Sequence, residues 1–252
     1  MGWFSDSKKE DIEERITERA DTIEERHDHI PRGRTTPRLD SLSLHSAKRY
    51  RLGMIFIDIN DFSGYMSRND DEDTLFMLNL FIPEAMELVR DFEGKLEKNT
   101  GDGILAYFGA GDSDQEAVEN LLEYIATLKW ALANHINPIL EEENIETISI
   151  SGGAAYDLVH ISRIGAHSGN QQMNRLTAVS TGANIASELE DMAGTNEYFV
   201  NDGIYQYSDK ENGWGQFVHD RGVHTGYLWA DETAHYYNFS GIWTDTDTEN
   251  LE

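Results

Sequence analysis

Hydrophobic and polar residues follow one another along the chain in blocks that predict a mixed α/β domain. The apolar run RLGMIFIDI, which ends in Asp58 and Ile59, is typical of a strand buried on both faces. Apolar residues then recur at helical spacing over about 72–92 and over 114–137, which predicts two long amphipathic helices. Between them, GKLEKNTGDGILAYFG predicts two short strands and a hairpin, because glycines on both sides of Asp102 permit a tight turn.

The second half of the chain continues this alternation. Strand signals occur in TISISGGAAY and LVHISRIG, and LTAVSTGANIASELEDMA predicts a strand, a turn and a helix. EYFVNDGIYQYS adds a strand and a short helix, and the aromatic-rich segment up to about residue 242 predicts a pair of strands. The order strand–helix–strand–strand–helix–strand favours a ferredoxin-like α/β sandwich.

The two ends of the chain differ from this body. Residues 7–29 predict a charged helix with a narrow apolar stripe, after which proline and glycine interrupt the pattern. We therefore expect an N-terminal helix and linker over 1–45, a globular domain over 46–243 and a solvated acidic tail over 244–252. The helix is expected to pack on its own domain or on a second copy of the chain.

Composition narrows the classes of function. The chain has 20 Lys and Arg against 47 Asp and Glu, a net charge of −27, which makes duplex nucleic acid and anionic membranes poor partners for the surface as a whole. It has no cysteine, so disulfides, thiolate nucleophiles and zinc–thiolate sites are excluded. No apolar run is long enough to cross a membrane and no signal peptide is visible, so we expect a cytoplasmic protein.

Two aspartates occupy positions that suit metal chemistry. Asp58 ends a buried strand and Asp102 lies at the hairpin tip, so antiparallel pairing of these strands would bring both carboxylates to one edge of the sheet. Oxygen ligands suit Mg²⁺ or Mn²⁺, and two such ions could activate a hydroxyl and stabilise a leaving pyrophosphate. Asp-Gly is also a common turn, so Asp102 taken alone has a purely structural explanation. The turn after Asp58 offers backbone N–H groups that could cradle phosphate oxygens, those of Asn60, Asp61, Phe62 and Ser63.

Over roughly residues 50–210 the sequence resembles the catalytic domain of class III nucleotidyl cyclases. FIDINDF is similar to the family's strand with its first metal aspartate, KNTGDGILA to its hairpin with the second, and TAVSTGANIAS to its strand–turn–helix with a characteristic Asn. The resemblance implies a head-to-tail homodimer with shared active sites and two divalent cations, Mn²⁺ or Mg²⁺, in each. One copy would hold the metals through Asp58, Asp102 and the Ile59 carbonyl, and the other would supply Lys98 and Thr177 at the base and Asn184 at the ribose.

The sequence departs from that family at one important position. The family's transition-state arginine, four residues after the Asn, is Glu188 here. A carboxylate at this position would oppose the negative charge of the reacting phosphate, so an active enzyme needs another cation. Arg163, Arg175 and Arg221 are the possible replacements. The family's triphosphate-binding lysine near the C-terminus also has no clear counterpart in RGVHTGYLW.

This combination most resembles the bacterial pyrimidine cyclases of the Pycsar anti-phage systems, whose cyclic UMP or cyclic CMP activates a separate effector protein. A smaller base would need bulky pocket walls, for which Tyr50 and Phe56 share strand parity with Asp58. The predicted activity is therefore that of a phosphorus–oxygen lyase converting UTP to 3′,5′-cyclic UMP and pyrophosphate. A cytidylate or purine (adenylate or guanylate) cyclase, and a catalytically silent cyclase-fold dimer that binds nucleotide, are the alternatives.

Overall fold

The computed structural model divides the chain into two compact units, Met1–Tyr50 with His160–Val179 and Arg51–Val159 with Ser180–Glu252. It describes residues 14, 16–18, 21–22, 25–26, 30–33, 42–166, 174–229 and 232–243. Most of the predicted N-terminal helix lies outside the described residues, although those described between 14 and 26 are helical. The whole of the predicted acidic tail, 244–252, lies outside them as well.

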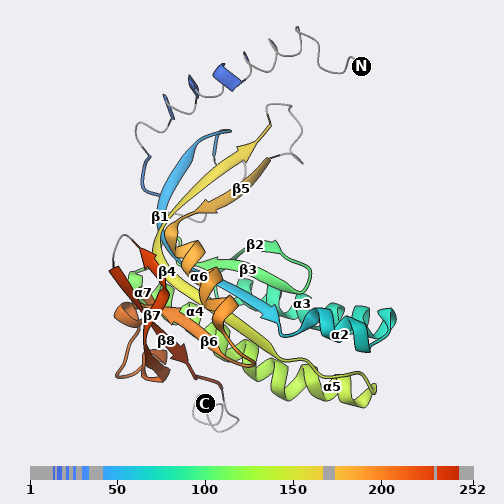
Figure 1. Cartoon of the computed structure of the whole chain (residues 1–252). Helices are drawn as coiled ribbons and strands as arrows, with labels where there is room; N and C mark the ends of the chain where they lie inside the picture. The colour runs from blue at the N-terminus through green and yellow to red at the C-terminus, as the bar shows by residue number, and fades with distance from the viewer. Residues whose placement is uncertain are drawn as a thin grey trace, which may run out of the picture. The chain divides into compact units, whose positions relative to one another are not determined.

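The larger unit is built on a sheet whose strands run in the order β2-β3-β1-β4-β6-β8-β7 (Figure 1). β1 and β2 both pair antiparallel with β3, and the order β2-β3-β1-β4 is that of a ferredoxin-like arrangement. β6 extends the sheet beyond this core by pairing parallel with β4. The strands are β1 (Ala47–Ile59), β2 (Lys95–Asn99), β3 (Gly103–Phe108), β4 (Ile150–Gly165), β6 (Tyr198–Asn201), β7 (Val218–Trp229) and β8 (Glu232–Phe239).

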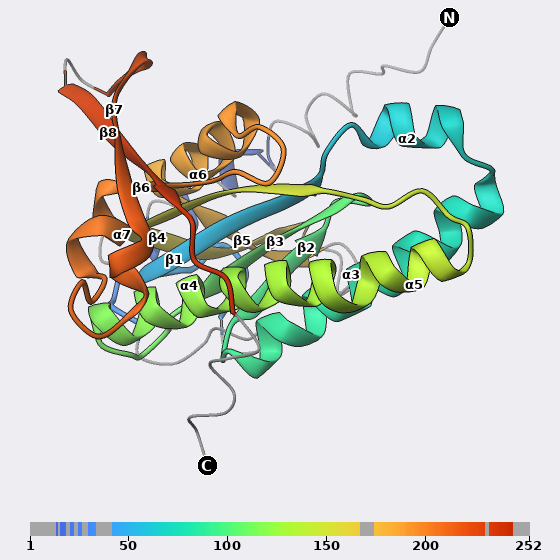
Figure 2. The ribbon, with the colours of Figure 1, turned by 90° about the horizontal axis from the view of Figure 1, so that it is seen from below.

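Helices cover both faces of this sheet, α3 and α4 on one and α6 on the other (Figure 2). The helical elements are α2 (Phe62–Arg68), α3 (Asp71–Asp91), α4 (Asp114–Ala131), α5 (Asn137–Glu142), α6 (Thr181–Met192) and α7 (Asp202–Tyr207), with a π turn η2 (Leu132–Ile136) and a 3₁₀ turn η4 (Trp214–Phe217). None of the described helices is both long enough and apolar enough to cross a membrane.

Side chains along β1 alternate between the two covered faces. A side chain at Gly53 would meet Leu121 of α4 at 2.5 Å, so the odd-numbered residues of this stretch face α3 and α4. Met54 lies on the opposite face, where its sulfur contacts the hydroxyl of Ser180, the N-cap of α6. Asp58 has the parity of Met54 and therefore lies on the α6 face. The odd-numbered Ile55, Ile57 and Ile59 are fully buried in the core.

The structure corrects three predicted elements. The helix predicted over 114–137 ends at Ala131 and continues as η2, because Pro138 has no N–H for a regular helical bond and a wider turn precedes it. TISISGGAAY and LVHISRIG form one strand, β4, in place of two. The polar residues that follow Asp58 begin a helix, α2, which their composition did not predict. The remaining predicted helices and strands after residue 46 are confirmed.

The smaller unit is organised around the second half of β4. Residues 160–165 of β4 pair antiparallel with β5 (Asn174–Val179), with Thr177 opposite Ser162. The segment before β1 is tied to the same strand, since the His45 N–H donates to the Arg163 carbonyl (2.8 Å) and the Arg163 N–H donates to the Ser46 carbonyl (3.1 Å). Tyr50 is buried here, with its ring against Gly33.

Candidate active site

Asp58 and Asp102 meet where β1 ends beside the β2–β3 hairpin. Asp58 lies opposite Gly103 in the β1–β3 register, and the Ile59 N–H donates to the Asp102 carbonyl (3.3 Å). A side chain at Gly103 would lie 2.1 Å from the Ile57 carbonyl and 2.6 Å from Asp58 Oδ1, so the hairpin needs glycine for this approach. The carboxyl groups of Asp58 and Asp102 are hydrogen-bonded to each other.

The electrostatics of this pair indicate a missing positive charge. Burial and, after it, the charge and hydrogen bond of Asp102 together raise the pKa of Asp58 to about 6. Asp191 of α6 adds a smaller repulsion. Because an opposite charge stabilises carboxylates in their ionised form, this site favours a bound cation over a bound proton at neutral pH.

Glu190 of α6 is part of the same acidic group, and sequence reasoning missed it. Burial raises its pKa to about 7, and repulsion from Asp58 and Asp191 contributes, while a hydrogen bond with Ser151 opposes the shift. Glu190 follows Asn184 by six positions, which places it on a different side of α6 from that predicted site residue. Only the close approach of α6 to the sheet brings it to Asp58.

Gly153 of β4 explains that close approach. A side chain there would lie 2.1 Å from the Ala186 carbonyl and 2.2 Å from the Glu190 backbone nitrogen, so the backbone of α6 rests directly on the strand. Ser151, two residues earlier on β4, is hydrogen-bonded to Glu190. Its hydroxyl also accepts from the Asn60 side-chain amide (2.8 Å). The turn after Asp58 is therefore linked through Ser151 to α6.

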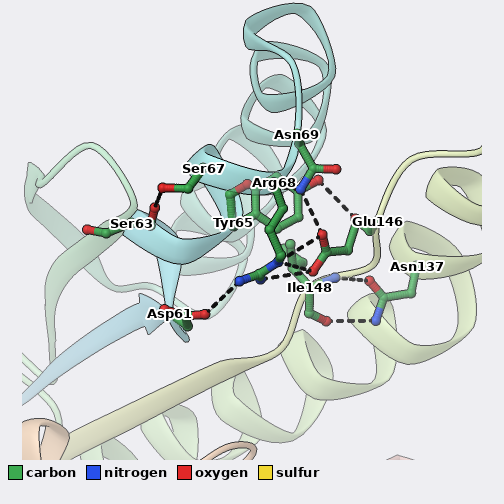
Figure 3. Close-up of polar contacts among 9 residues, drawn as sticks. All are labelled: Asp61, Ser63, Tyr65, Ser67, Arg68, Asn69, Asn137, Glu146 and Ile148. Atoms are coloured by element: carbon green, nitrogen blue, oxygen red, sulfur yellow. Dashed lines mark hydrogen bonds and ion pairs between the residues drawn. The ribbon is translucent and has the colours of Figure 1, made fainter.

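The predicted phosphate cradle is partly engaged within the protein. The Asn60 N–H donates to the Ser149 carbonyl (2.9 Å), so it is not free for a phosphate. Asp61 adopts a left-handed conformation (φ 52°) at the start of α2, and Arg68 joins its carboxylate (3.0 Å) to that of Glu146 (2.9 Å; Figure 3). The N–H groups of Phe62 and Ser63 lie in the first turn of α2, where helical N–H groups have no helical partner.

The residues predicted to act on a second copy of the chain are accessible. Lys98 is exposed on β2 and Asn184 is exposed on α6. Thr177 is partly exposed on β5, within the smaller unit. The side chains of all three lack hydrogen bonds and ion pairs to other described residues. Phe56 is partly exposed on β1, whereas the second predicted wall residue, Tyr50, is buried against Gly33.

The structure separates the three arginines that could replace the missing cation. The Arg163 guanidinium donates to the Leu42 carbonyl (3.1 Å), and Arg221 forms an ion pair with Glu197 (3.6 Å). Arg175 is exposed on β5 and pairs with no described acidic group. Glu188 lies one turn after Asn184, on the same side of α6. Of these three arginines, Arg175 is thus the one left available to a ligand.

Asp58 and Asp102 fit a divalent cation that shares its coordination with a substrate. Within the described ranges, no three His, Asp or Glu side chains converge as a closed metal site. Hard cations such as Mg²⁺ bind through one or two carboxylates together with waters and substrate phosphates, so a closed protein cage is not required. The Ile59 carbonyl, adjacent to Asp58, is the third oxygen ligand that the sequence predicts.

Comparison with known proteins supports this description of the domain. No family model matches the chain. Two proteins named cytidylate cyclase, from Staphylococcus aureus and Escherichia coli, are each 23% identical to it over 172 and 177 residues, which are 68% and 69% of the chain. These alignments cover 40% and 39% of the relatives, so the chain spans about two fifths of their length.

Solved structures give the same result for the fold. The adenylyl cyclase CyaB from P. aeruginosa superimposes with a TM-score of 0.68 at 16% identity, covering 79% of this chain and 98% of that chain. The chain therefore has the fold of the class III nucleotidyl cyclase domains, and proteins named cytidylate cyclase are among its sequence relatives.

Proposed function

We propose that this domain is a metal-dependent nucleotidyl cyclase that converts a pyrimidine nucleoside triphosphate to its 3′,5′-cyclic nucleotide and pyrophosphate. The observation that carries the proposal is the pairing of Asp58 and Asp102, two carboxyl groups hydrogen-bonded to each other at one edge of the sheet. The raised pKa of Asp58 reflects a site whose negative charge is balanced by no described cation. A polyphosphate cannot approach such a site without divalent metal, so the acidic pair favours a metal–triphosphate complex.

The chemistry is an in-line displacement at the α-phosphorus. The ribose 3′-oxygen forms a bond to that phosphorus, the bond to the bridging oxygen of pyrophosphate breaks, and the 3′-hydroxyl proton passes to water. Divalent cations, when bound, supply Lewis-acid activation of the 3′-hydroxyl and neutralise charge on the leaving pyrophosphate. Asp58, Asp102 and the Ile59 carbonyl would hold these cations at the strand ends. The N–H groups of Phe62 and Ser63, in the first turn of α2, would donate to phosphate oxygens.

A second copy of the chain would complete the site. Lys98 and Asn184 are exposed and make no side-chain hydrogen bonds to described residues, as residues that act across an interface would be. In the proposed homodimer Lys98 and Thr177 contact the base and Asn184 orients the ribose. Arg175 is the proposed substitute for the arginine that Glu188 replaces, because the other two arginines are engaged within their own units.

The choice between the two pyrimidines is part of the proposal. The sequence resemblance favours UTP, whereas two relatives are named cytidylate cyclases. Uracil and cytosine differ by reversal of a hydrogen-bond acceptor and donor at one edge, which a buried polar group can discriminate strongly. We propose UTP or CTP as the substrate in preference to a purine triphosphate. The product would serve as a cytoplasmic second messenger that activates a separate effector in defence against phage.

One assay tests the activity. The purified protein is incubated with each of the four ribonucleoside triphosphates and Mn²⁺, and the products are identified by mass spectrometry. We expect a cyclic pyrimidine nucleotide, and its loss in Asp58→Asn and Asp102→Asn. A purine product alone would overturn the pyrimidine assignment, and turnover by both variants would overturn the metal site.

Glu188 specifically favours the alternative of a silent nucleotide-binding dimer. Its carboxylate stands where the family places a transition-state cation, on the same side of α6 as Asn184. Triphosphate binding detected by calorimetry, without a cyclic product from any of the four nucleotides, would support this alternative against the cyclase.

A further inference from the structure

A cavity of about 250 Å³ lies where α4 ends. None of the residues that line it belongs to the Asp58–Asp102 site. Apolar side chains make most of its wall, namely Leu132 of the π turn η2, Ile148, Tyr198 and Ile242. Lys129, in the last turn of α4, brings a charged group to this apolar wall. A π turn beside a cavity is notable because such turns occur frequently at functional sites.

The ammonium of Lys129 has no anionic partner. It donates one hydrogen bond, to the Gly241 carbonyl (2.7 Å), and lies over the rings of Tyr198 (5.1 Å) and Phe239 (5.5 Å). No described carboxylate forms an ion pair with it, although the chain has 47 acidic residues. Burial lowers the pKa of Lys129 to about 8, so the ammonium form still predominates at neutral pH. Two of its three N–H groups remain for another acceptor.

The cavity wall is held in place before any ligand binds. The Asn137 side chain donates to the Ile148 carbonyl (2.9 Å) and accepts from the Ile148 N–H (3.1 Å), which fixes the segment before β4 against the start of α5. Asn196 is held in a left-handed conformation (φ 60°), and its N–H donates to the Ile150 carbonyl (3.1 Å). Its side-chain amide is exposed at the cavity and bonds to no described residue. A fixed wall lowers the entropic cost of binding.

We propose that this cavity binds a small organic carboxylate with a short aliphatic or aromatic body. The apolar walls match the body of such an acid, and the Lys129 ammonium matches its carboxylate. The exposed Asn196 amide offers a second donor in the lining. Drug-sized ligands occupy cavities of roughly 300–1,000 Å³, so the smaller volume here selects a smaller acid. A phosphate or sulfate lacks the apolar body that this wall requires.

Calorimetric titration with hexanoate and benzoate tests the proposal, using the full chain without nucleotide or metal. For a ligand of this size we expect a dissociation constant of about 1 mM or below. Hexanamide and benzamide keep the shape without the charge, and acetate keeps the charge without the body. Each should bind at least tenfold more weakly. Equal binding of amides and acids, or no binding of either acid, would overturn the proposal.

Variants separate the cavity from a general charge effect. Lys129→Met should weaken benzoate binding at least tenfold. Lys210→Met is a matched control, because Lys210 also lies over a tyrosine ring, that of Tyr205 (4.3 Å), but outside the cavity. It should leave binding unchanged. Ala133→Phe adds bulk at a residue that lines the cavity while keeping Lys129, so loss of binding in this variant tests the site even if Lys129→Met fails to fold.

The chain itself carries another source of carboxylates, in the sequence TDTDTENLE of residues 244–252. A variant that ends at Trp243 distinguishes that source from a free acid. Equal binding by the full and shortened chains supports a free ligand. Binding by the shortened chain alone would assign the cavity to the tail and overturn the proposal as stated.

Discussion

The two ends of the buried part of β1 place charged groups in opposite circumstances. Near its start, Arg51 donates to Asp114 (3.1 Å) and to the Tyr207 hydroxyl (2.8 Å), and the Tyr156 hydroxyl donates to the other Asp114 oxygen (2.7 Å). Each charge there has an opposite partner. At the carboxyl end, Asp58 faces other acids and has no described cation.

The difference teaches how to separate structural charge from functional charge in this protein. A satisfied network stabilises the fold, because breaking it leaves half-buried polar groups without partners. An acidic group whose members repel one another weakens the fold and is retained where a ligand supplies the missing charge. We therefore expect substitutions at the Arg51 end to change stability, and substitutions at the Asp58 end to change metal binding and catalysis.

The largest expected effect is that of Asp58→Asn. Loss of a metal-binding carboxylate removes several kcal/mol of transition-state stabilisation, so kcat/KM should fall by about 10³-fold or more. The metal-free melting temperature should stay the same or rise, because the substitution removes repulsion from Asp102. Activity assays and thermal denaturation in chelator measure the two quantities. A fall in melting temperature equal to that of a core substitution would mean that Asp58 is structural.

Asp114→Asn should give the opposite pattern. It leaves Arg51 without its ion pair and Tyr156 with a weaker acceptor, at a cost of about 1–2 kcal/mol. For a chain of this length we expect the melting temperature to fall by about 2–8 °C. Activity per folded molecule should remain within about twofold, since no site residue is changed. A large loss of activity at unchanged stability would contradict the comparison.

A smaller effect is expected from pH on the metal-free protein. The pKa values of Asp58 and Glu190 are raised to about 6 and about 7, above those of the unfolded chain. Their contribution to stability is therefore full below about pH 4 and is lost as pH rises through 6 to 7. Glu190→Gln should flatten this decline, raising the melting temperature at pH 8 by about 2 °C relative to wild type. Mn²⁺ should flatten it in the wild type too; equal pH profiles for both proteins in chelator would contradict the assignment.

The smallest effect is expected for Ser151→Ala. The Ser151 hydroxyl accepts from the Asn60 amide and is hydrogen-bonded to Glu190, so its loss frees the turn after Asp58 from α6. We expect the Mn²⁺ concentration for half-maximal activity to rise by a few-fold, at nearly unchanged stability. Ser67→Ala is a suitable control, because that hydroxyl donates only to the Ser63 carbonyl one turn away. An identical change in both variants would exclude a specific role for Ser151.

Local patterns in the sequence predict the part of the site that depends on neighbouring residues. The apolar run before Asp58 and the glycines around Asp102 determine a strand and a hairpin, and these two elements alone bring the carboxylates together. Glu190 and Lys129 depend on contacts distant in sequence. Glu190 reaches the site only because Gly153 admits α6, and Lys129 becomes isolated only because Gly241 and Tyr198 enclose it. No spacing rule in the chain indicates either contact.

The resting of α6 on Gly153 has a consequence for cooperativity. The same helix presents Glu190 toward Asp58 of its own chain and Asn184 toward solvent. In the proposed dimer, that Asn184 would contact the ribose of the nucleotide held by the second copy. A small displacement of α6 that accompanies metal binding at one site would therefore move the ribose contact of the other. Two sites in such a dimer would not turn over independently, and a Hill coefficient different from one for Mn²⁺ would be the signature of that coupling.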